Sequence, residues 1–500
     1  MNYSVLTNPA VPVTWMDGRA GEVGIREAML RAHEIRDVQG DTPLERFAVL
    51  RLLITMAMDM LHPETSYDRR DILDAGRFDP NVFDAYVSEC EKDGPRFDLF
   101  DPDHPFLQSR YDQKLDEKAK KPVATIIHSL PSGNNHLFID HRLESEHHVT
   151  AAKAFRALCA SYLFSTYGLW GPFSVNNKPP LYISIIGDKL FETIVMNMLS
   201  VAEVQPLTYA VSQVPWRIDR EVIPWQKVPD VSFLEGLTWM PRRITLLPDS
   251  DWHVSSVCFQ PGLDFRGNES WADPFVPKRS NNDGALYNVT PVLDRAIWRD
   301  VSTLLYDQDG GAVRQPQIIR CLTNLLDEDE LPLWIRLRAT GLCTIKASYL
   351  GWIEDELSLP SELMYSQAQA ELFRNHVQMV ERIQSGVYSN VQKYVDKLRS
   401  GADNKEHEIA TQCQQDFLLG AHDLLFGQAL SEIIAHVPAK ECVDHFCDAV
   451  ATLLQDVIRR VLRPSGKSVK AVMSQIEAEK WIWIGFNKIK EERKKSYAGE

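Results

Sequence analysis

The chain has 500 residues, 44% of them hydrophobic and 25% charged, so it is too long for one hydrophobic core and has a globular composition. Its formal net charge of −15 disfavours a free-standing nucleic-acid-binding protein, which normally carries a basic balance. Eight cysteines without a Cys-x-x-Cys pair, and a start without a basic and apolar leader, predict a cytoplasmic protein without disulfides or a membrane span.

The first hundred residues predict a mixture of short elements. Residues 8–13, with two prolines, predict a short edge strand, because proline is tolerated at sheet edges, and a turn follows at residues 17–18. Apolar residues at helical spacing predict an amphipathic helix over residues 24–38. Thr42, Pro43 and Glu45 form a helix start, and the helix to residue 61 is apolar enough to be buried. Residues 93–108 predict an ordered loop anchored by phenylalanine and leucine.

Two loops flank one apolar helix in the middle of the mixed region. A polar turn at residues 132–136 precedes a helix predicted over residues 148–167, and a loop rich in glycine, proline and asparagine follows over residues 168–180. These loops offer backbone groups, amide side chains, aromatic rings and one lysine. Such a surface suits a polymer backbone or base edges better than a reacting small molecule. Two ordinary surface loops are the alternative interpretation.

Residues 181–360 predict strands and a hairpin. The run 236–247 ends in a strand that carries Arg242 and Arg243, whose side chains point to opposite faces of a sheet. One arginine could therefore meet a phosphate while the other forms a structural ion pair. Residues 337–352 predict a β-hairpin with its tip near Thr344, Ile345 and Lys346.

The character of the chain changes at residue 361. Amphipathic helices are predicted over residues 361–384, 386–400, 404–435, 438–463 and 468–494, the pattern of an antiparallel bundle. The sequence therefore predicts the α+β class, with a mixed domain at residues 1–360 and a four-helix-type bundle at residues 361–500. From Arg459 onward there are 11 basic and 5 acidic residues, which indicates either a track for DNA or a solvated helix face.

Catalytic motifs are missing from the sequence. There is no phosphate loop, no nucleophile elbow and no dinucleotide-binding glycine fingerprint, so we expect a binding or assembly protein without catalytic residues, cofactor or metal. The alternative is a metal-dependent hydrolase or nuclease that uses the histidine cluster from His136 to His148, which includes His141 and His147. Stoichiometric zinc or manganese together with nuclease activity would favour that alternative.

Several weak motifs occur in a fixed order along the chain. They are residues 8–13 with 17–18, residues 97–100 with 104–108, residues 134–138, residues 236–239 with 242–244, residues 298–300, and the terminal helical bundle. Taken together, the sequence resembles the CasA family, the large subunits of the type I-E Cascade surveillance complexes of bacterial CRISPR immunity. The resemblance implies a non-enzymatic subunit of a ribonucleoprotein.

The resemblance also implies roles for three segments. It places the contact with the 5′ handle of the guide RNA (crRNA) at Asn134, Asn135 and Phe138. It assigns recognition of the protospacer-adjacent motif in double-stranded DNA to a glycine loop with its neighbours and to candidates for a minor-groove lysine, namely Gly168, Leu169, Trp170, Gly171, Asn176, Asn177, Lys178, Gln260 and Lys278. It assigns the strand-separating wedge to Thr344, Ile345 and Lys346.

This chain departs from the family pattern at two of these places. Its loop has two glycines with Trp170 between them, and Lys346 stands where the family has a glutamine at the wedge. The position of the family's minor-groove lysine has three candidates, Gln260, Arg266 and Lys278. The partners implied are the crRNA, double-stranded target DNA, the other Cascade subunits and a helicase-nuclease, without a membrane.

Overall fold

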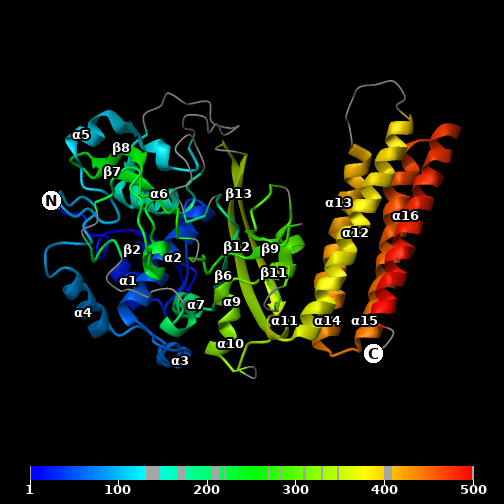
Figure 1. The fold of residues 1–500 in the computed structure, drawn as a ribbon, viewed down its shortest axis with the longest axis horizontal. Coiled ribbons are helices and arrows are strands. Elements are labelled where there is room, and N and C mark those ends of the chain that lie inside the picture. The colour runs from blue at the N-terminus through cyan, green and yellow to red at the C-terminus, as the bar shows by residue number, and fades with distance from the viewer. Residues whose placement is uncertain are drawn as a thin grey trace. The chain divides into compact units, whose positions relative to one another are not determined.

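The computed structural model describes residues 2–130, 147–166, 175–176, 178–204, 214–218, 221–268, 271–281, 283–293, 295–307, 311–327, 330–345, 348–398 and 408–497. Contacts divide the chain into two units. We call Met1–Arg295 with Ala312–Ser358 the mixed unit, and Ala296–Gly311 with Leu359–Glu500 the helical unit (Figure 1). The chain leaves the mixed unit for the last time near the end of strand β13, which runs from Ser348 to Pro360.

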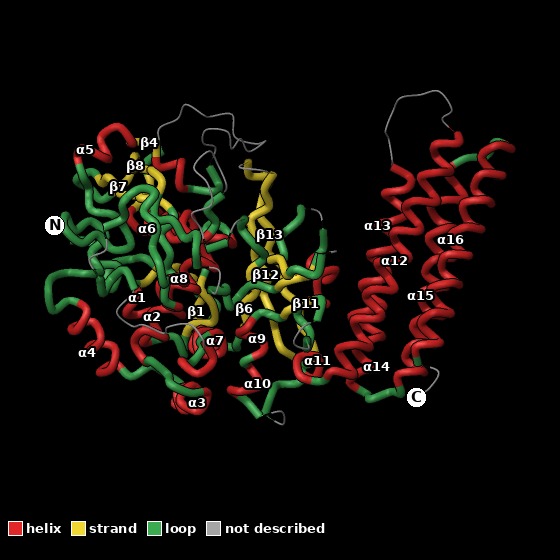
Figure 2. Tube along the Cα trace, viewed as in Figure 1, coloured by secondary structure: helices red, strands yellow, loops and turns green. Residues whose placement is uncertain are grey.

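Short antiparallel sheets build the mixed unit (Figure 2). Their strand orders are β2-β1-β3, β10-β9-β11, β13-β12-β6 and β4-β8-β5, with β7 also paired to β8. The bounds are β1 Val11–Trp15, β2 Ala20–Val23, β3 Ile35–Val38, β4 Lys120–Pro122, β5 Val149–Thr150, β6 Tyr182–Ile186, β7 Arg242–Pro248, β8 His253–Pro261, β9 Lys278–Ser280, β10 Leu286–Asn288, β11 Val313–Arg314 and β12 Trp334–Ile345.

Strand β1 is central in its sheet, so the predicted edge position is wrong. The sheet order is β2-β1-β3, and the carbonyl of Pro12 accepts a hydrogen bond of 2.7 Å from the backbone N–H of Gln39. The nitrogen and carbonyl of one strand residue point to the same side, and β3 ends at Val38. The missing N–H of Pro12 therefore falls at the very end of the ladder with β3, beyond Val38, so proline removes only one terminal hydrogen bond there.

Residues 24–38 form helix α1 (Ile25–Leu30), a turn and strand β3, so the prediction of one long helix is wrong. The predicted inward positions are nevertheless buried, namely Ile25, Ala28, Met29, Ala32 and Ile35. Apolar spacing identified the buried side correctly. It could not show that the last inward residue lies on a strand, because position 35 fits both patterns.

Helices pack around α2 in the mixed unit. The helices are α2 Pro43–Leu61, α3 Ser66–Ala75, α4 Pro80–Cys90, α5 Gln113–Asp116, α6 Ala151–Leu163, α7 Leu190–Asn197, α8 Phe233–Leu237, α9 Gln317–Arg320 and α10 Leu322–Leu325. The predicted start of α2 is confirmed, because the Thr42 side chain accepts a hydrogen bond of 3.2 Å from the N–H of Glu45. Helices α6, α7 and α8 contact α2, which is buried along nearly its whole length.

The loop over residues 93–108 is packed, as predicted. Phe97, Leu99 and Phe106 are buried. The Gln108 amide donates a hydrogen bond of 2.6 Å to the Leu99 carbonyl and accepts one of 2.7 Å from the N–H of Leu246. The amide side chain therefore ties the loop to strand β7.

The helical unit is a bundle of long helices (Figure 1). Its helices are α11 Glu362–Tyr365, α12 Gln367–Leu398, α13 Glu408–Asp423, α14 Leu430–Ile434, α15 Ala439–Val457 and α16 Val469–Ser496. The predicted break at Gly386 is wrong, because α12 continues through it. A single glycine costs a helix only about 1 kcal/mol, which bundle packing outweighs. The predicted α+β class, with short antiparallel sheets and a helical C-terminal region, is confirmed.

One described helical stretch, Glu408–Ile434, meets the length and composition of a membrane span. Core helices of bundles meet the same criterion. Here Cys413, Phe417 and Leu425 are buried within the helical unit, so their apolar character is explained by packing.

Candidate nucleic-acid interface

The predicted site residues fall partly outside the described residues. Those outside are Asn134, Asn135, Phe138, Gly168, Leu169, Trp170, Gly171, Asn177 and Lys346. Those described are Asn176, Lys178, Gln260, Lys278, Thr344 and Ile345, together with residues on both sides of each predicted loop. The geometry of the candidate interface therefore rests on where the loops begin and end.

The predicted hairpin is present as strands β12 and β13, which lie side by side in one sheet. Strand β12 is held on its other side by β6, with five residue pairs from Arg336↔Ile186 to Thr340↔Tyr182. Thr344 is half-buried near the end of β12, and the next residue, Ile345, is 61% exposed. The hairpin is thus anchored along its stem and presents an exposed apolar side chain close to its tip.

Residues next to three predicted contact segments meet in one cluster. The His128 ring stacks on the Tyr349 ring with a centroid distance of 5.2 Å and an interplanar angle of 29°, and lies edge-on to Phe164 at 6.3 Å. The His128 imidazole is also hydrogen-bonded to the Phe164 backbone, and the Thr166 side chain is hydrogen-bonded to the Tyr349 hydroxyl. We call His128, Phe164, Thr166 and Tyr349 the stem cluster.

Arg242 of strand β7 joins the stem cluster. Its Nη2 donates a hydrogen bond of 3.1 Å to the Thr166 carbonyl, and its guanidinium lies 5.9 Å from the centre of the Phe259 ring. Burial lowers the pKa of Arg242 to about 10, which leaves the side chain charged at neutral pH. Arg242 therefore fixes the last described residue before the glycine loop.

The neighbouring Arg243 forms the predicted structural ion pair on the opposite side of β7. Both Arg243 and Asp116 are fully buried, and Arg243 donates two hydrogen bonds to the Asp116 carboxylate, of 3.0 and 2.8 Å. Gln260 of strand β8 donates a hydrogen bond of 2.7 Å to the same carboxylate. The side chain of Gln260 is thus engaged in this buried group and not in the stem cluster.

A buried polar network holds the described residue Asn176, beside the second predicted loop. Its Nδ2 donates hydrogen bonds to the Tyr182 hydroxyl at 3.2 Å and to Asp273 at 3.3 Å, and its Oδ1 accepts one of 2.7 Å from Asn288. Asp273 in turn forms a buried ion pair of 2.9 Å with Arg51 of helix α2. The Asn176 amide is therefore placed in a supporting network.

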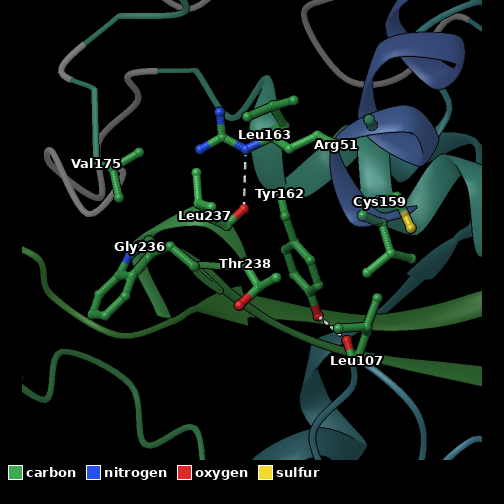
Figure 3. Close-up of a pocket in the computed structure, with 12 residues that line it drawn as sticks. Arg51, Leu107, Cys159, Tyr162, Leu163, Val175, Gly236, Leu237 and Thr238 are labelled. Atoms are coloured by element: carbon green, nitrogen blue, oxygen red, sulfur yellow. Dashed lines mark hydrogen bonds between the residues drawn. The ribbon is translucent and has the colours of Figure 1, made fainter. Parts of the chain in front are cut away.

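Figure 3 shows a cavity beside this network, at the end of the same loop. Its volume is about 50 Å³, and Arg51, Tyr162, Val175 and Thr238 are among the residues that line it. Arg51 donates a hydrogen bond of 3.0 Å to the Leu237 carbonyl at its wall. A space of this size holds water, which is compatible with the polar groups around it.

Lys278 lies beside the Asn176 network on strand β9. Antiparallel pairing places Asn288 and Arg314 directly opposite Lys278, so the three side chains share one face of the small sheet. Burial and the charge of Arg314 lower the pKa of Lys278, while Asp273 opposes that shift. The half-buried Lys278 and the exposed Lys178 thus place two cations near Asn176.

Arg266, the third candidate for the minor-groove cation, is placed differently. Its Nε lies 2.9 Å from both carboxylate oxygens of Asp264, and its side chain is 54% exposed. An arginine held by the carboxylate two residues away is partly neutralised. Of the three candidates, Lys278 is the one beside the network that holds Asn176.

The histidine alternative is only partly visible, because His136 and His141 lie outside the described residues. Within the described ranges, no three histidine, cysteine, aspartate or glutamate side chains gather closely enough to hold a metal ion. His147 is half-buried and His148 is exposed, directly before strand β5. The metal alternative gains no support from these residues.

The stem cluster predicts a pH dependence of stability. Burial lowers the pKa of His128 from 6.5 to about 4, so the unfolded chain binds a proton below pH 6.5 that the folded chain excludes. Stability is therefore complete above pH 6.5 and is lost as pH falls towards 4. We expect urea denaturation to show a loss of about 2 kcal/mol between pH 8 and pH 5 from this residue.

The control for this pH effect is His128→Gln, in which that contribution to the pH slope should disappear. His376 in the helical unit is a second buried histidine with its pKa lowered to about 4 by burial, so it should produce a similar slope there. An equal pH slope in the wild-type chain and His128→Gln would contradict the prediction.

Comparison with known proteins places these features in a family context. The sequence profile of CRISPR-associated protein Cse1 matches residues 5–459. A CRISPR-associated protein CasA/Cse1 from Thermus thermophilus is 28% identical over 412 residues, which cover 77% of this chain and 76% of that relative.

Solved structures share the fold over nearly the whole chain. Cse1 of Thermobifida fusca has a TM-score of 0.79 at 20% identity, covering 97% of this chain and 98% of its own. CasA of Thermus thermophilus has a TM-score of 0.77 at 22% identity, covering 98% and 100%. A chain from a CRISPR RNA-guided surveillance complex has a TM-score of 0.78 at 19% identity, covering 96% and 99%.

Proposed function

Because this chain belongs to the CRISPR-associated protein Cse1 family, as its motifs predicted, we propose that it acts in a CRISPR RNA-guided surveillance complex as the subunit that recognises the protospacer-adjacent motif. In this role it contacts double-stranded target DNA, helps to start strand separation, holds the 5′ handle of the crRNA and recruits the helicase-nuclease. Each of these roles consists of binding another molecule, and no covalent step is assigned to this chain.

The observation that carries the proposal is the convergence of three loop stems in the stem cluster. His128 precedes the predicted handle-binding loop by a few residues, Thr166 lies two residues before the first glycine of the predicted motif-reading loop, and Tyr349 lies at the start of the second hairpin strand. Tyr349 contacts both His128 and Thr166, although the three come from distant parts of the sequence. A single anchor for three loops suits a protein that reads a motif, opens the duplex and passes one strand to the guide.

The polar and charged residues around Asn176, namely Lys178, Lys278 and Asn288, support the proposed reading of the motif. The minor groove displays a degenerate pattern of acceptors, so one cation and exposed backbone groups can read it loosely and accept several motifs. Lys278 and Lys178 supply positive charge in a chain that is acidic overall. Because the net negative charge repels DNA elsewhere, we expect DNA to be attracted mainly to the surface around these two lysines. We propose Lys278 as the minor-groove cation on these grounds.

The structure of the β12–β13 hairpin supports its proposed role as the strand-separating wedge. Exchanging a DNA duplex for a guide–target heteroduplex is nearly balanced in free energy, with stacking worth about 1.4 kcal/mol per base-pair step. A small exposed tip that unstacks the first pair therefore suffices to start the exchange. Ile345, with 61% of its side chain exposed beside a stem held by β6, is suited to that insertion.

A mobility-shift experiment tests the proposed function. The remaining subunits with crRNA are assembled with and without this chain and incubated with a target library in which the motif positions are randomised. We expect binding to select a subset of motifs only when this chain is present. Equal recovery of all motifs with and without the chain would contradict the proposal, and guide-independent DNA cleavage that needs a metal would favour the hydrolase alternative.

A further inference from the structure

Three segments of the mixed unit are tied together by side chains that no sequence motif indicates. The aromatic ring of Tyr349 lies against His128 on one side, and its hydroxyl meets the Thr166 side chain on the other. His128 is hydrogen-bonded to the backbone of Phe164, two residues before Thr166. One tyrosine at the base of the hairpin therefore contacts the residues that lead into both predicted nucleic-acid loops.

The residues of the stem cluster lie close in sequence to the predicted loops. His128 lies two residues before Leu130, after which the predicted handle-binding loop begins, and an extended chain covers at most about 3.6 Å per residue. Thr166 ends the described residues before the motif-reading loop, and two residues, 347 and 348, lie between the predicted hairpin tip and Tyr349. The stem cluster thus joins described residues that lie two to six positions along the sequence from the predicted contact residues Asn134, Gly168 and Lys346.

The cluster is also stiff. His128 and Phe164 are buried, and the two rings on His128 meet it in stacked and edge-on arrangements, which are the preferred geometries of ring pairs. Arg242 adds a hydrogen bond from strand β7 to the Thr166 carbonyl. Packed interiors transmit displacement because they do not deform continuously.

We propose that Tyr349 and His128 are positioning residues that couple motif binding to strand opening, by holding the hairpin in register with the motif-reading loop. This inference rests on the proposed function, since it names the connection between two of its steps. Neither side chain touches DNA in this role. The wedge works on duplex DNA only when its base is fixed relative to the bound motif.

The test compares opening of duplex DNA with binding of DNA that is already open. Complexes reconstituted with wild-type chain or Tyr349→Leu are mixed with a target that carries 2-aminopurine next to the motif, and the opening rate is followed by fluorescence. We expect Tyr349→Leu to open duplex about tenfold more slowly, a factor that corresponds to about 1.4 kcal/mol. The affinity for a target with a premade bubble at the same position should be unchanged.

Phe100→Leu is the matched control, because Phe100 stacks on Trp252 elsewhere in the mixed unit with the same centroid distance of 5.2 Å. It should open duplex at the wild-type rate. Tyr349→Phe keeps the stacked ring and loses only the hydroxyl. We expect this variant to fold normally, so slower opening by it cannot be attributed to a folding defect. We expect it to slow opening about threefold, again with normal binding of the bubble target.

Three results would overturn the inference, namely wild-type opening rates for both Tyr349 variants, an equal loss of affinity on the bubble target, or equal slowing in Phe100→Leu. Failure of the proposed function is separate and is read from the wild-type complex alone. If that complex opens DNA regardless of the motif, the proposed function fails. If it opens DNA only next to the motif and the Tyr349 variants match it, only the coupling fails.

Discussion

Replacing Lys278 with methionine should weaken motif-dependent binding of target DNA by about tenfold in the reconstituted complex. Methionine keeps an unbranched apolar side chain on strand β9 and removes the charge beside Asn288 and Arg314. We expect the substitution to cause no loss of folding stability. Because burial lowers the pKa of Lys278, the charged form is disfavoured in the folded state, and a neutral side chain should leave stability unchanged or raise it.

The two readouts for Lys278→Met are the dissociation constant for a target with the preferred motif and the midpoint of thermal unfolding. Lys121→Met is the control, since Lys121 is an exposed lysine on strand β4. It should bind as the wild type does. Undiminished motif-dependent binding by Lys278→Met would remove Lys278 from the role of minor-groove cation and leave Arg266 as the charged candidate.

Replacing Asp116 with asparagine should cost about 3–5 kcal/mol of folding free energy, the largest stability effect that we predict. Asp116 and Arg243 are both completely buried, and the carboxylate also accepts hydrogen bonds from Gln260 and from the N–H of Asp112. Asparagine leaves the guanidinium buried without an opposite charge. Urea denaturation followed by tryptophan fluorescence measures the loss.

Asp17→Asn is the control for Asp116→Asn, because Asp17 pairs with Arg19 at 2.7 Å while the two side chains are 52% and 76% exposed. An exposed pair of this kind contributes at most about 1 kcal/mol. The double variant Asp116→Leu with Arg243→Met, which removes both charges, should recover much of the loss. A cost of less than about 1 kcal/mol for Asp116→Asn would contradict the structural role of this pair.

Elements set by local sequence could be predicted well. The capping threonine of α2, the hairpin of β12 and β13, and most bundle helices depend on residues a few positions apart. The errors arose where tertiary context decides. A proline strand became central because its neighbour ended early, and a glycine break vanished because bundle packing of α12 outweighs one unfavourable residue.

The candidate interface could be predicted only as a set of loops. Its supporting contacts join residues far apart in sequence, such as Arg51 with Asp273, 222 positions away, and Arg243 with Asp116, 127 positions away. The stem cluster is of the same kind, because nothing near His128 indicates that Tyr349 is its partner. The adjacent Arg242 and Arg243 were the one local signal: the predicted ion pair is formed by Arg243, whereas the predicted phosphate contact stays a prediction.

Site-specific photocrosslinking tests most directly whether the residues around Asn176 contact the protospacer-adjacent motif in bound DNA. A benzophenone side chain is introduced in Lys178→p-benzoylphenylalanine, two residues after Asn176, and as a control in Tyr67→p-benzoylphenylalanine on helix α3, where the native side chain is 80% exposed. In complexes bound to target DNA, position 178 should crosslink to the motif base pairs and position 67 should not. Crosslinks from position 67 to the motif, or from position 178 only to DNA outside it, would contradict the proposed site.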